Sequence, residues 1–324
     1  MKAPKEVQRW ASIDLGTNTI LLLIADIRTD GSFRVIDDRA QITRLGQGVD
    51  RSGLLSDGAQ NHSLAALKDY ARHCQALGVD KVVVVGTSAL RDAANRDDFI
   101  ARLEQECGWK LRVLSGEEEA RYSFVAVCCG LDLKGQKVLA VDVGGGSTEL
   151  IRGKDGALSA WVTMQLGSVR LTERYLLADP PVEEQCRQVT ASIDRELERQ
   201  CAGWRAVYAA PTMVGIAGTF TTLAAIAQGR KTYSHGDVHG SRLTRAGVQR
   251  LIGLFESQTA IQRRQIPGLD PGRADVILAG SLLVERVMGF FNIDQVWISD
   301  QGVRYGVLYE KLKRDHAKPG SIIG

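Results

Sequence analysis

Ile13-Asp14-Leu15-Gly16-Thr17-Asn18 is a glycine-containing break between two apolar runs, Arg9–Asp14 and Thr19–Ile27. The arrangement returns 128 positions later, where Val141-Asp142-Val143-Gly144-Gly145-Gly146 separates two further apolar runs. Two apolar runs joined by a short break that contains glycine are the sequence signal of a β-hairpin. We infer an ancient duplication that produces two α/β domains, each of which begins with a strand, a glycine turn and a second strand.

The length of the chain also predicts two domains. Domains of roughly 100–200 residues are usual, and this chain has 324 residues. Gly135 is the clearest break between the halves, so we expect domain I over residues 1–135 and domain II over residues 136–302. Hydrophobic residues make up 44% of the chain and charged residues 24%, which predicts a protein with a substantial core and excludes a disordered one.

Periodicity and turn signals predict the other elements. Apolar residues at helical spacing indicate helices, and short apolar runs between breaks indicate strands. The expected strands include Ser32–Thr43, Lys81–Val85, Leu111–Leu114, Leu158–Thr163, Ala206–Tyr208 and Gln295–Ile298. The expected helices are Leu54–Leu77, one capped by Asp97 or Asp98 that continues to Glu106, Glu183–Gln200, Thr219–Ala227, Thr244–Ser257, Arg273–Phe290 and Val303–Lys313.

A glycine-rich turn that begins with aspartate suits a polyphosphate ligand. Glycines let the backbone approach an anion and turn its N–H groups inward. The carboxylates of Asp14 and Asp142 would repel phosphate, so they imply a bridging divalent cation, with Mg²⁺ the first candidate. Thr17, Ser147 and Thr148 add hydroxyl donors. Such turns also occur in ordinary hairpins, but two equivalent copies favour phosphate binding.

A third glycine-rich stretch, Gly215-Ile216-Ala217-Gly218-Thr219, leads into a predicted helix. A helix N-terminus with glycine and threonine can bind an anion or a nucleotide, although the same pattern also serves strand–helix packing. Neither a Walker A sequence nor G-x-G-x-x-G occurs in the chain, which excludes P-loop and Rossmann proteins at the level of motifs.

Ser115-Gly116-Glu117-Glu118-Glu119-Ala120-Arg121 places three adjacent carboxylates at a predicted helix start. Ser115 and Glu118 have the spacing of a capping box. The helix dipole alone favours acidic residues there. The alternative is that one glutamate points into a site as a general base. Adjacent helical residues are about 100° apart, so at most one or two of the three can face such a site.

Charge and cysteine usage exclude several classes of protein. A net charge of +3 is too mild to predict DNA binding. No apolar run approaches the roughly 18 residues of a membrane helix, and the N-terminus lacks the apolar core of a signal peptide. The six cysteines include no C-x-x-C pair, so we expect buried, reduced thiols rather than zinc ligands. We therefore expect a cytoplasmic protein without DNA or membrane partners.

A set of motifs in this chain resembles the exopolyphosphatase/guanosine pentaphosphate phosphohydrolase (Ppx/GppA) family. The motifs, which extend over nearly the whole chain, are Ile13–Asn18, Gly86–Arg91, Ser115–Arg121, Val141–Leu150, Leu166–Glu173, Gly218–Thr219, Val238–Gly240, Pro267–Leu269, Arg273–Ile277 and Ser299–Gly302. The resemblance implies an α/β fold of two related actin-like (ribonuclease H-like) domains with an interdomain cleft. It also implies a short, two-domain member whose C-terminal helix, about residues 303–324, packs back on domain I.

The resemblance further implies roles for individual residues. Glu119, which immediately precedes Ala-Arg, matches the catalytic glutamate of the family. Asp14 and Asp142 match the phosphate-loop aspartates of the family, and Glu149 matches a carboxylate near the metal and water. We expect Asp142 and Glu149 to hold the metal, which would be Mg²⁺ or another divalent cation. The residues expected to bind phosphate are Asp14, Gly16, Thr17, Asn18, Arg91, Gly144, Gly145, Gly146, Ser147, Thr148, Gly218 and Thr219.

These residues predict a hydrolase of phosphoanhydride bonds. We expect an exopolyphosphatase that releases orthophosphate from the end of inorganic polyphosphate by metal-assisted attack of water. Hydrolysis of guanosine pentaphosphate at the same centre is the alternative. A kinase-like transferase and a non-catalytic alarmone or polyphosphate sensor are weaker alternatives, because Glu119 and the other carboxylates are intact. Whether the protein forms a homodimer is left open.

A basic cluster after Thr219 is a candidate to guide the rest of a polyphosphate chain, with a solvated loop as the alternative. Its members are Arg230, Lys231, His235, His239, Arg242 and Arg245. His235 and His239 with Asp237 are weaker candidates for metal ligands, because the intervening Gly236 favours a loop.

Overall fold

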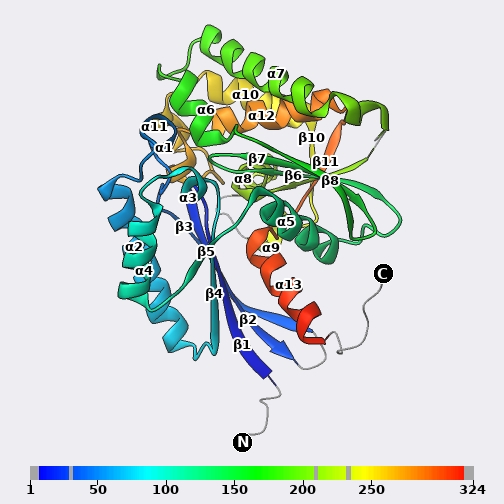
Figure 1. Ribbon diagram of the computed structural model, residues 1–324. Helices are drawn as coiled ribbons and strands as arrows, with labels where there is room; N and C mark the ends of the chain where they lie inside the picture. The colour runs from blue at the N-terminus through cyan, green and yellow to red at the C-terminus, as the bar shows by residue number, and fades with distance from the viewer. Residues whose placement is uncertain (1–6, 29–31, 208–210, 231–234, 317–324) are drawn as a thin grey trace, which may run out of the picture. The chain divides into compact units, whose positions relative to one another are not determined.

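The computed structural model describes residues 7–28, 32–207, 211–230 and 235–316 (Figure 1). The chain forms two compact units. Unit 1 contains residues 1–126 and 303–324, and unit 2 contains residues 127–302. The division falls inside helix α5 (Gly116–Gly130), while the C-terminal helix α13 (Val303–His316) belongs to unit 1. Both units therefore share one continuous helix.

Unit 1 is built on a five-stranded mixed sheet in the order β3-β2-β1-β4-β5. The first three strands are antiparallel neighbours, whereas β1, β4 and β5 run parallel. Because the carboxyl ends of parallel strands meet at one edge of a sheet, the segments that follow these three strands come together. The strands are β1 (Val7–Leu15), β2 (Thr19–Arg28), β3 (Phe33–Ile42), β4 (Lys81–Gly86) and β5 (Leu111–Val113).

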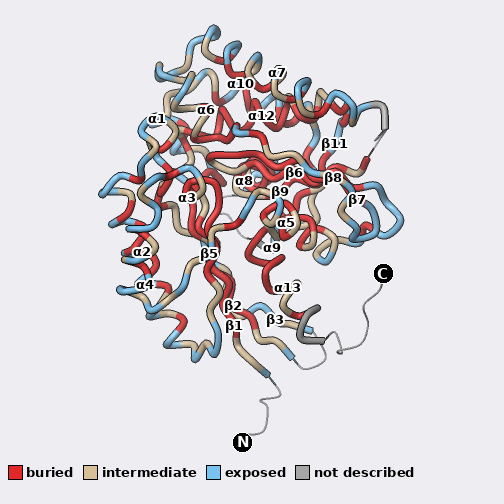
Figure 2. Tube along the Cα trace, in the orientation of Figure 1, coloured by how far each residue is buried: buried red, intermediate tan, exposed pale blue. Residues whose placement is uncertain are grey.

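Helices cover both faces of this sheet. Helices α2 (Asp57–Ala76) and α4 (Arg96–Cys107) share a core with Ile13 and Leu15 of β1. On the other face, Trp10 of β1 packs in a second core that includes α13. The strand is consequently covered on both sides, and every residue from Trp10 to Leu15 is buried instead of every second one (Figure 2). Two short helices complete the unit, α1 (Val49–Ser52) and α3 (Ser88–Asp92).

Unit 2 is built on a six-stranded sheet in the order β10-β11-β9-β6-β7-β8. Strand β6 pairs antiparallel with β7 and parallel with β9, and β11 also runs parallel to β9. The strands are β6 (Lys137–Val143), β7 (Thr148–Lys154), β8 (Ala157–Met164), β9 (Thr212–Ile216), β10 (Arg242–Thr244) and β11 (Gln295–Ile298).

The helices of unit 2 share one large core with the sheet, in which helix α8 contributes Phe220 and helix α12 contributes Leu283. The longer helices are α6 (Ser168–Tyr175), α7 (Glu183–Val207), α8 (Ala217–Ala227), α10 (Arg245–Glu256) and α12 (Ile277–Phe290). The short ones are α9 (His235–Val238), α11 (Ala260–Arg263) and the 3₁₀ turn η1 (Pro271–Arg273).

The two sheets have the same topology over five strands, and β10 of unit 2 has no counterpart in unit 1. Strands β1 to β5 correspond to β6, β7, β8, β9 and β11, and the opening hairpins share one register: Asp14 lies opposite Leu21, and Asp142 lies opposite Glu149. The structure confirms the predicted α/β class with two related actin-like domains and supports the inferred duplication.

Three local predictions are wrong or incomplete. Ala206 and Val207 belong to α7 and not to a strand, while Tyr208 lies outside the described residues; the strand is Thr212–Ile216 instead. Asn95, not Asp97 or Asp98, precedes α4, and both aspartates lie in its first turn. Helix α6 (Ser168–Tyr175) was not expected. Helix ends are where local sequence is least decisive, because neighbouring elements determine them.

The six cysteines are free, but they are not all buried as expected. Cys74, Cys186 and Cys201 are buried, Cys107 and Cys128 are half-buried, and Cys129 is exposed. Burial raises the pKa of Cys74 to about 11, which keeps that thiol protonated.

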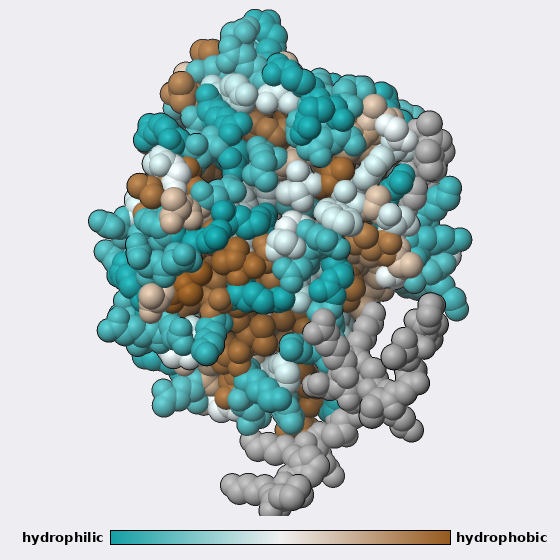
Figure 3. Space-filling model, in the orientation of Figure 1, coloured by the Kyte–Doolittle hydropathy of each residue, from teal (hydrophilic) through white to brown (hydrophobic). Residues whose placement is uncertain are grey.

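The surface of unit 1 has an apolar area where the sheet ends. Figure 3 shows apolar side chains over the region in which Figure 1 draws β4 and β5. Val83 of β4 and Val113 of β5 are half-buried. Strand β5 is the edge of the sheet and has three residues, which limits edge-to-edge pairing. Within the described ranges, no helix has the length and apolar character needed to span a bilayer.

One stability prediction follows from the packing of α13. A Cβ on Gly306 would overlap the backbone carbonyl of Tyr122 in α5. We expect Gly306→Ala to lower the free energy of unfolding by about 1–3 kcal/mol, because a rigid backbone cannot yield easily. The matched control is Gly253→Ala in α10, where an added Cβ meets nothing within 4 Å. That change should be neutral or stabilising by up to about 1 kcal/mol. Urea unfolding measures both, and equal midpoints would contradict the argument.

Candidate active site

The glycine turn of unit 1 is fixed by backbone hydrogen bonds. The Gly16 N–H donates to the Thr19 carbonyl at 3.0 Å and closes the turn. The Thr17 carbonyl accepts from the N–H of Gly46 at 2.8 Å, and the Asn18 carbonyl accepts from the N–H of Thr43 at 3.1 Å. The segment after β3 therefore holds the turn in place.

The glycine turn of unit 2 repeats this construction. The Gly144 N–H donates to the Ser147 carbonyl at 3.1 Å. The carbonyls of Gly144 and Gly145 accept from the first turn of α6, and the Ser168 N–H lies 2.9 Å from the Gly144 oxygen. A Cβ on Gly167 would overlap the Gly145 backbone, so only glycine permits this approach.

A pair of threonines supports the two turns from equivalent places. The Thr219 hydroxyl donates to the Val143 carbonyl at 3.4 Å, and the Thr87 hydroxyl donates to the Leu15 carbonyl at 3.4 Å. Leu15 and Val143 are equivalent positions, and both threonines follow the fourth strand of their unit. Thr87 was absent from the predicted site. A sequence signal did exist: the dipeptide Gly-Thr occurs at 86–87 and again at 218–219. The interval between these two dipeptides differs from the interval between the two glycine turns, so the repeat of the turns does not reveal it.

Two carboxylates stand side by side in unit 2. Asp142 of β6 lies opposite Glu149 of β7, and their side chains are buried, with 8% and 1% exposed respectively. The Ser147 hydroxyl donates to Glu149 Oε1 at 2.9 Å. The counterpart of Glu149 in unit 1 is Leu21, so the carboxylate pair exists in one unit alone.

This donor set fits Mg²⁺. Mg²⁺ is bound through one or two carboxylates together with substrate phosphates and waters, and it needs no cage made only of protein ligands. Asp142 and Glu149 supply two such carboxylates on adjacent strands. In the part of the chain that the structure describes, no group of three or more His, Cys, Asp or Glu residues could hold a metal. Phosphate oxygens and waters would complete the coordination of a cation bound to these two carboxylates.

The three glutamates of α5 point in different directions, as helical geometry requires. Glu117 is exposed, Glu118 is half-buried and Glu119 is buried. The predicted capping box is present: the Ser115 N–H donates to Glu118 at 2.9 Å, and the Glu118 N–H donates to Ser115 Oγ at 3.1 Å. The Ser115 N–H lowers the pKa of the Glu118 carboxyl below its ordinary value. Glu118 is thus committed to the cap, and Glu119 is the buried one of the three.

Glu119 is paired with a residue that the sequence placed on phosphate. Arg91 Nη1 lies 2.5 Å from Glu119 Oε2 and also donates to the Leu114 carbonyl at 3.1 Å. Arg91 follows β4 and Leu114 follows β5, so the parallel ends of these strands bring the pair together. The structure thereby adds a carboxylate partner to the predicted phosphate role of Arg91. No sequence signal indicated this pairing, which joins positions 28 apart.

Gly218, the predicted residue at the start of α8, gives room for an arginine. A Cβ there would overlap the guanidinium of Arg273. Ala217 beside it has a φ of 68°, a left-handed conformation that alanine rarely adopts. The backbone at this turn therefore has a conformation that lets the Arg273 guanidinium lie directly against Gly218. Arg273 was noted in the sequence as part of a motif but not as a site residue.

The basic cluster after Thr219 is engaged in separate contacts. Arg245 pairs with Glu285 at 2.7 Å, Arg230 lies 3.4 Å from Asp237, and Arg242 stacks over Trp297 with 4.1 Å between the guanidinium carbon and the ring centroid. His239 Nδ1 lies 2.8 Å from Asp300 Oδ1. Lys231 and the side chain of His235 lie outside the described residues. These contacts support structural roles over a shared polyphosphate track.

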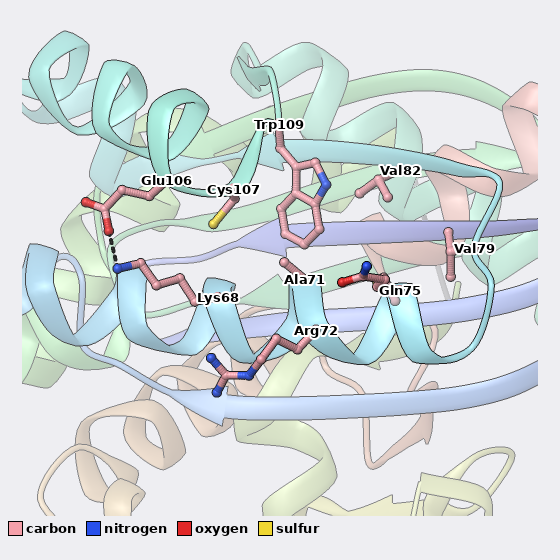
Figure 4. Close-up of a pocket in the computed structure, with 10 residues that line it drawn as sticks. Lys68, Ala71, Arg72, Gln75, Val79, Val82, Glu106, Cys107 and Trp109 are labelled. Atoms are coloured by element: carbon pink, nitrogen blue, oxygen red, sulfur yellow. Dashed lines mark ion pairs between the residues drawn. The ribbon is translucent and has the colours of Figure 1, made fainter.

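A cavity of about 560 Å³ in unit 1 involves none of the predicted site residues. Figure 4 shows Trp109 directed into it and the ion pair between Lys68 and Glu106 at one end. Cys74 and Cys107 also line it, and burial raises the pKa of both thiols. The cavity therefore offers no activated nucleophile.

Comparison with known proteins identifies the family. The model of the Ppx/GppA phosphatase family matches residues 23–315. Exopolyphosphatase 2 of Mycobacterium tuberculosis is 37% identical over 317 residues, which cover 92% of this chain and 97% of that protein. Exopolyphosphatase 1 of Mycobacterium bovis is 29% identical, covering 94% of this chain and 88% of that protein.

Solved structures of similar proteins indicate the same family. The crystal structure of the Ppx/GppA family member from Aquifex aeolicus has a TM-score of 0.80 and 32% identity, covering 96% of this chain and 100% of that one. The exopolyphosphatase structure from Cytophaga hutchinsonii has a TM-score of 0.87 and 29% identity, covering 97% and 100%. The duplicated turns, the buried glutamate and these similarities lead to one conclusion: the chain belongs to the Ppx/GppA phosphatase family and is a phosphohydrolase.

Proposed function

We propose that this protein is an exopolyphosphatase, which releases orthophosphate from the end of inorganic polyphosphate. The observation that carries the proposal is the duplicated glycine turn that follows Asp14 in unit 1 and Asp142 in unit 2. In unit 2, Asp142 lies opposite Glu149 and the two form an acidic pair. The relatives named exopolyphosphatase, one of them 37% identical, support this substrate over others. The free cysteines suit the reducing cytoplasm, which we propose as the location.

The turns and Arg91 bind phosphate in this proposal. Backbone N–H groups of glycine-rich turns neutralise an anion without adding side-chain bulk. The Asn18 amide is buried, and neither its Oδ1 nor its Nδ2 has a hydrogen-bond partner in the described structure. A buried unsatisfied polar group costs about 1–3 kcal/mol, which a phosphate oxygen or its water would offset. Arg91 has five N–H donors, enough for a carboxylate and a phosphate together.

Glu119 acts on water as the general base. The Glu119 carboxylate lies 2.5 Å from the Arg91 guanidinium, which fixes its position. Water attacks the terminal phosphorus, its proton passes to a Glu119 oxygen, and the bond to the bridging oxygen breaks. Electrons of that bond leave with the shortened chain. Positioning and charge neutralisation supply most of the acceleration in such transfers.

Asp142 and Glu149 would hold the divalent cation that the family resemblance implies. When bound, that cation supplies positive charge to phosphate oxygens. The Ser147 hydroxyl, which donates to Glu149, keeps this carboxylate oriented. Asp14 has no carboxylate opposite it on β2, because Leu21 occupies that position. In this proposal Asp14 belongs to the phosphate-binding turn of unit 1.

The decisive experiment measures phosphate release from long polyphosphate, guanosine pentaphosphate and ATP in parallel. We expect polyphosphate to have the highest kcat/KM. Glu119→Gln should keep the fold and lose turnover by roughly 10²–10⁴-fold, since a general base contributes that much. Glu117→Gln, an exposed neighbour in the same helix turn, is the matched control and should stay near wild type.

A clear preference for guanosine pentaphosphate would replace the proposed substrate with the alternative. More than about a tenth of wild-type activity in Glu119→Gln would remove the general-base role, since the expected loss is at least about 100-fold.

Removal of metal should abolish activity. We expect dialysis against EDTA to stop phosphate release and added Mg²⁺ to restore it. Asp142→Asn should raise the Mg²⁺ concentration needed for half-maximal rate, because a charged ligand is lost. Leu21→Asn, at the position equivalent to Glu149 in unit 1, should leave that concentration unchanged. Full activity after EDTA treatment would contradict the role of the acidic pair.

The threonine pair should affect binding more than turnover. Thr87→Val and Thr219→Val each remove one hydrogen bond to a turn carbonyl while keeping the shape of the side chain. We expect KM to rise about 2-fold to 10-fold in each variant, corresponding to about 0.5–1.5 kcal/mol. Thr221→Val, whose hydroxyl donates within α8 to the Ala217 carbonyl, is the control. Rescue by serine at 87 and 219 would confirm the hydroxyl; unchanged KM would refute it.

A further inference from the structure

A half-buried histidine meets the C-terminal end of α5, the helix that carries Glu119 in its first turn. His239 lies between α9 and β10, and its Nε2 is 3.0 Å from the carbonyl oxygen of Gly130, the last residue of α5. Its Nδ1 is 2.8 Å from Asp300 Oδ1, which follows β11. All three residues belong to unit 2.

The backbone around His239 is held tightly against the end of β11. The Gly240 N–H donates to the Ile298 carbonyl at 2.8 Å, and the Ile298 N–H donates to the Ser241 carbonyl at 2.9 Å. These bonds join the backbone next to His239 to the end of β11, which Asp300 follows, and none of them involves α5. The His239 ring is therefore attached to the sheet of unit 2 through these backbone bonds, and the last residue of α5 contacts it there.

Both ring nitrogens of His239 face acceptors. A neutral imidazole has one N–H, whereas the imidazolium has two and can satisfy a carboxylate and a carbonyl together. The Asp300 backbone nitrogen also lies 3.3 Å from Nδ1 and could donate to a neutral ring. That tautomer would set the Nδ1 lone pair against the Asp300 carboxylate at 2.8 Å. The geometry thus favours the charged ring.

The end of the helix adds to this preference. The last carbonyls of a helix carry the negative end of its dipole, which stabilises a nearby cation. A Cβ on Gly130 would meet the Gln301 side chain at 2.5 Å and His239 Cε1 at 3.3 Å, so glycine permits the close approach. Gln301 is neutral, and the nearest charged residue on α9, Asp237, pairs with Arg230. Asp300 is therefore the charged group that faces the ring.

We propose that His239 is a positioning residue: its imidazolium joins the Asp300 carboxylate to the last carbonyl of α5 and so holds the helix that presents Glu119. This inference rests on the proposed function for Glu119. An α-helix transmits a constraint along its axis because its backbone hydrogen bonds are continuous. Loss of the clamp should then lower kcat and leave KM nearly unchanged, because the phosphate-binding turns are not touched.

The pH dependence has a definite sign. The hydrogen bond with Asp300 raises the pKa of His239 above its ordinary value, and burial opposes the shift. A group with a raised folded pKa stabilises the fold fully below its ordinary value of about 6.5 and loses that contribution as pH rises through the raised value. Turnover should therefore decline on the alkaline side as the ring loses its proton.

The test compares His239→Gln with His73→Gln. His73 is a matched control because it also pairs with a carboxylate, Asp37, and its side chain is equally exposed, at 22%. We expect His239→Gln to lower kcat by roughly tenfold, within the range of up to about 100-fold that small displacements far from the chemistry can cause. The alkaline decline should vanish in this variant. His73→Gln should keep the wild-type pH profile.

Asp300→Asn gives a second readout with the ring intact. Removing the carboxylate should lower the pKa of His239 and move the alkaline decline to lower pH. NMR of the imidazole nitrogens follows the same titration in the whole protein without reference to activity, and both nitrogens of His239 should be protonated at pH 7.

Three results would overturn the inference: a neutral His239 ring at pH 7, an unchanged pH profile in His239→Gln, or equal effects of His239→Gln and His73→Gln. The proposed function can fail separately. If the wild-type protein released phosphate from none of the three substrates, the exopolyphosphatase assignment would fall, and the imidazole resonances would still decide the clamp.

Discussion

In both units, the register of the opening hairpin sets which side chains can meet at its turn. One strand pairing puts Asp14 opposite Leu21 and Asp142 opposite Glu149. A slip of one residue would send every side chain of the hairpin to the other face of the sheet. The turn hydrogen bonds of Gly16 and Gly144 prevent this, because each closes its loop over the same interval. The acidic pair of unit 2 is therefore a consequence of register, with no further element needed to assemble it.

The direction of the strands supplies the second part of the site. Because β1, β4 and β5 run parallel, the residues that follow them gather at one edge, and this brings Arg91 to Glu119. A carboxylate that is 7% exposed needs a counter-charge, since an unpaired buried charge costs several kcal/mol. The guanidinium of Arg91 supplies this counter-charge in unit 1. A guanidinium also suits a phosphate, and in the proposed function Arg91 pairs with Glu119 and binds phosphate with its remaining donors.

Local sequence predicted what local geometry determines. The two turns and the capping box of Ser115 follow from spacing over a few residues, and the structure has them. Spacing alone did not show which of the three glutamates is buried; the family resemblance indicated Glu119, and Glu119 is the buried one. Long-range contacts were beyond that reasoning: Arg91 with Glu119, and His239 with Gly130, join residues that only the sheet topology brings together. The false strand at Ala206–Tyr208 has a related cause. Helix α7 continues to Val207, beyond the residues whose local sequence predicts a helix. Trp204, which lies in this last part of the helix, packs against the core of unit 2.

The duplicated turns have diverged in a way that separates their tasks. Thr17 and Asn18 in unit 1 occupy the positions of Gly145 and Gly146 in unit 2. The unit 2 turn can therefore present bare backbone, and its carbonyls bind the start of α6. The unit 1 turn retains side chains, including the unsatisfied Asn18 amide. Unit 1 contains the buried Glu119 paired with Arg91, whereas unit 2 contains the acidic pair Asp142 and Glu149. Neither unit has both features, so the two copies differ in the acidic residues that they place near their turns.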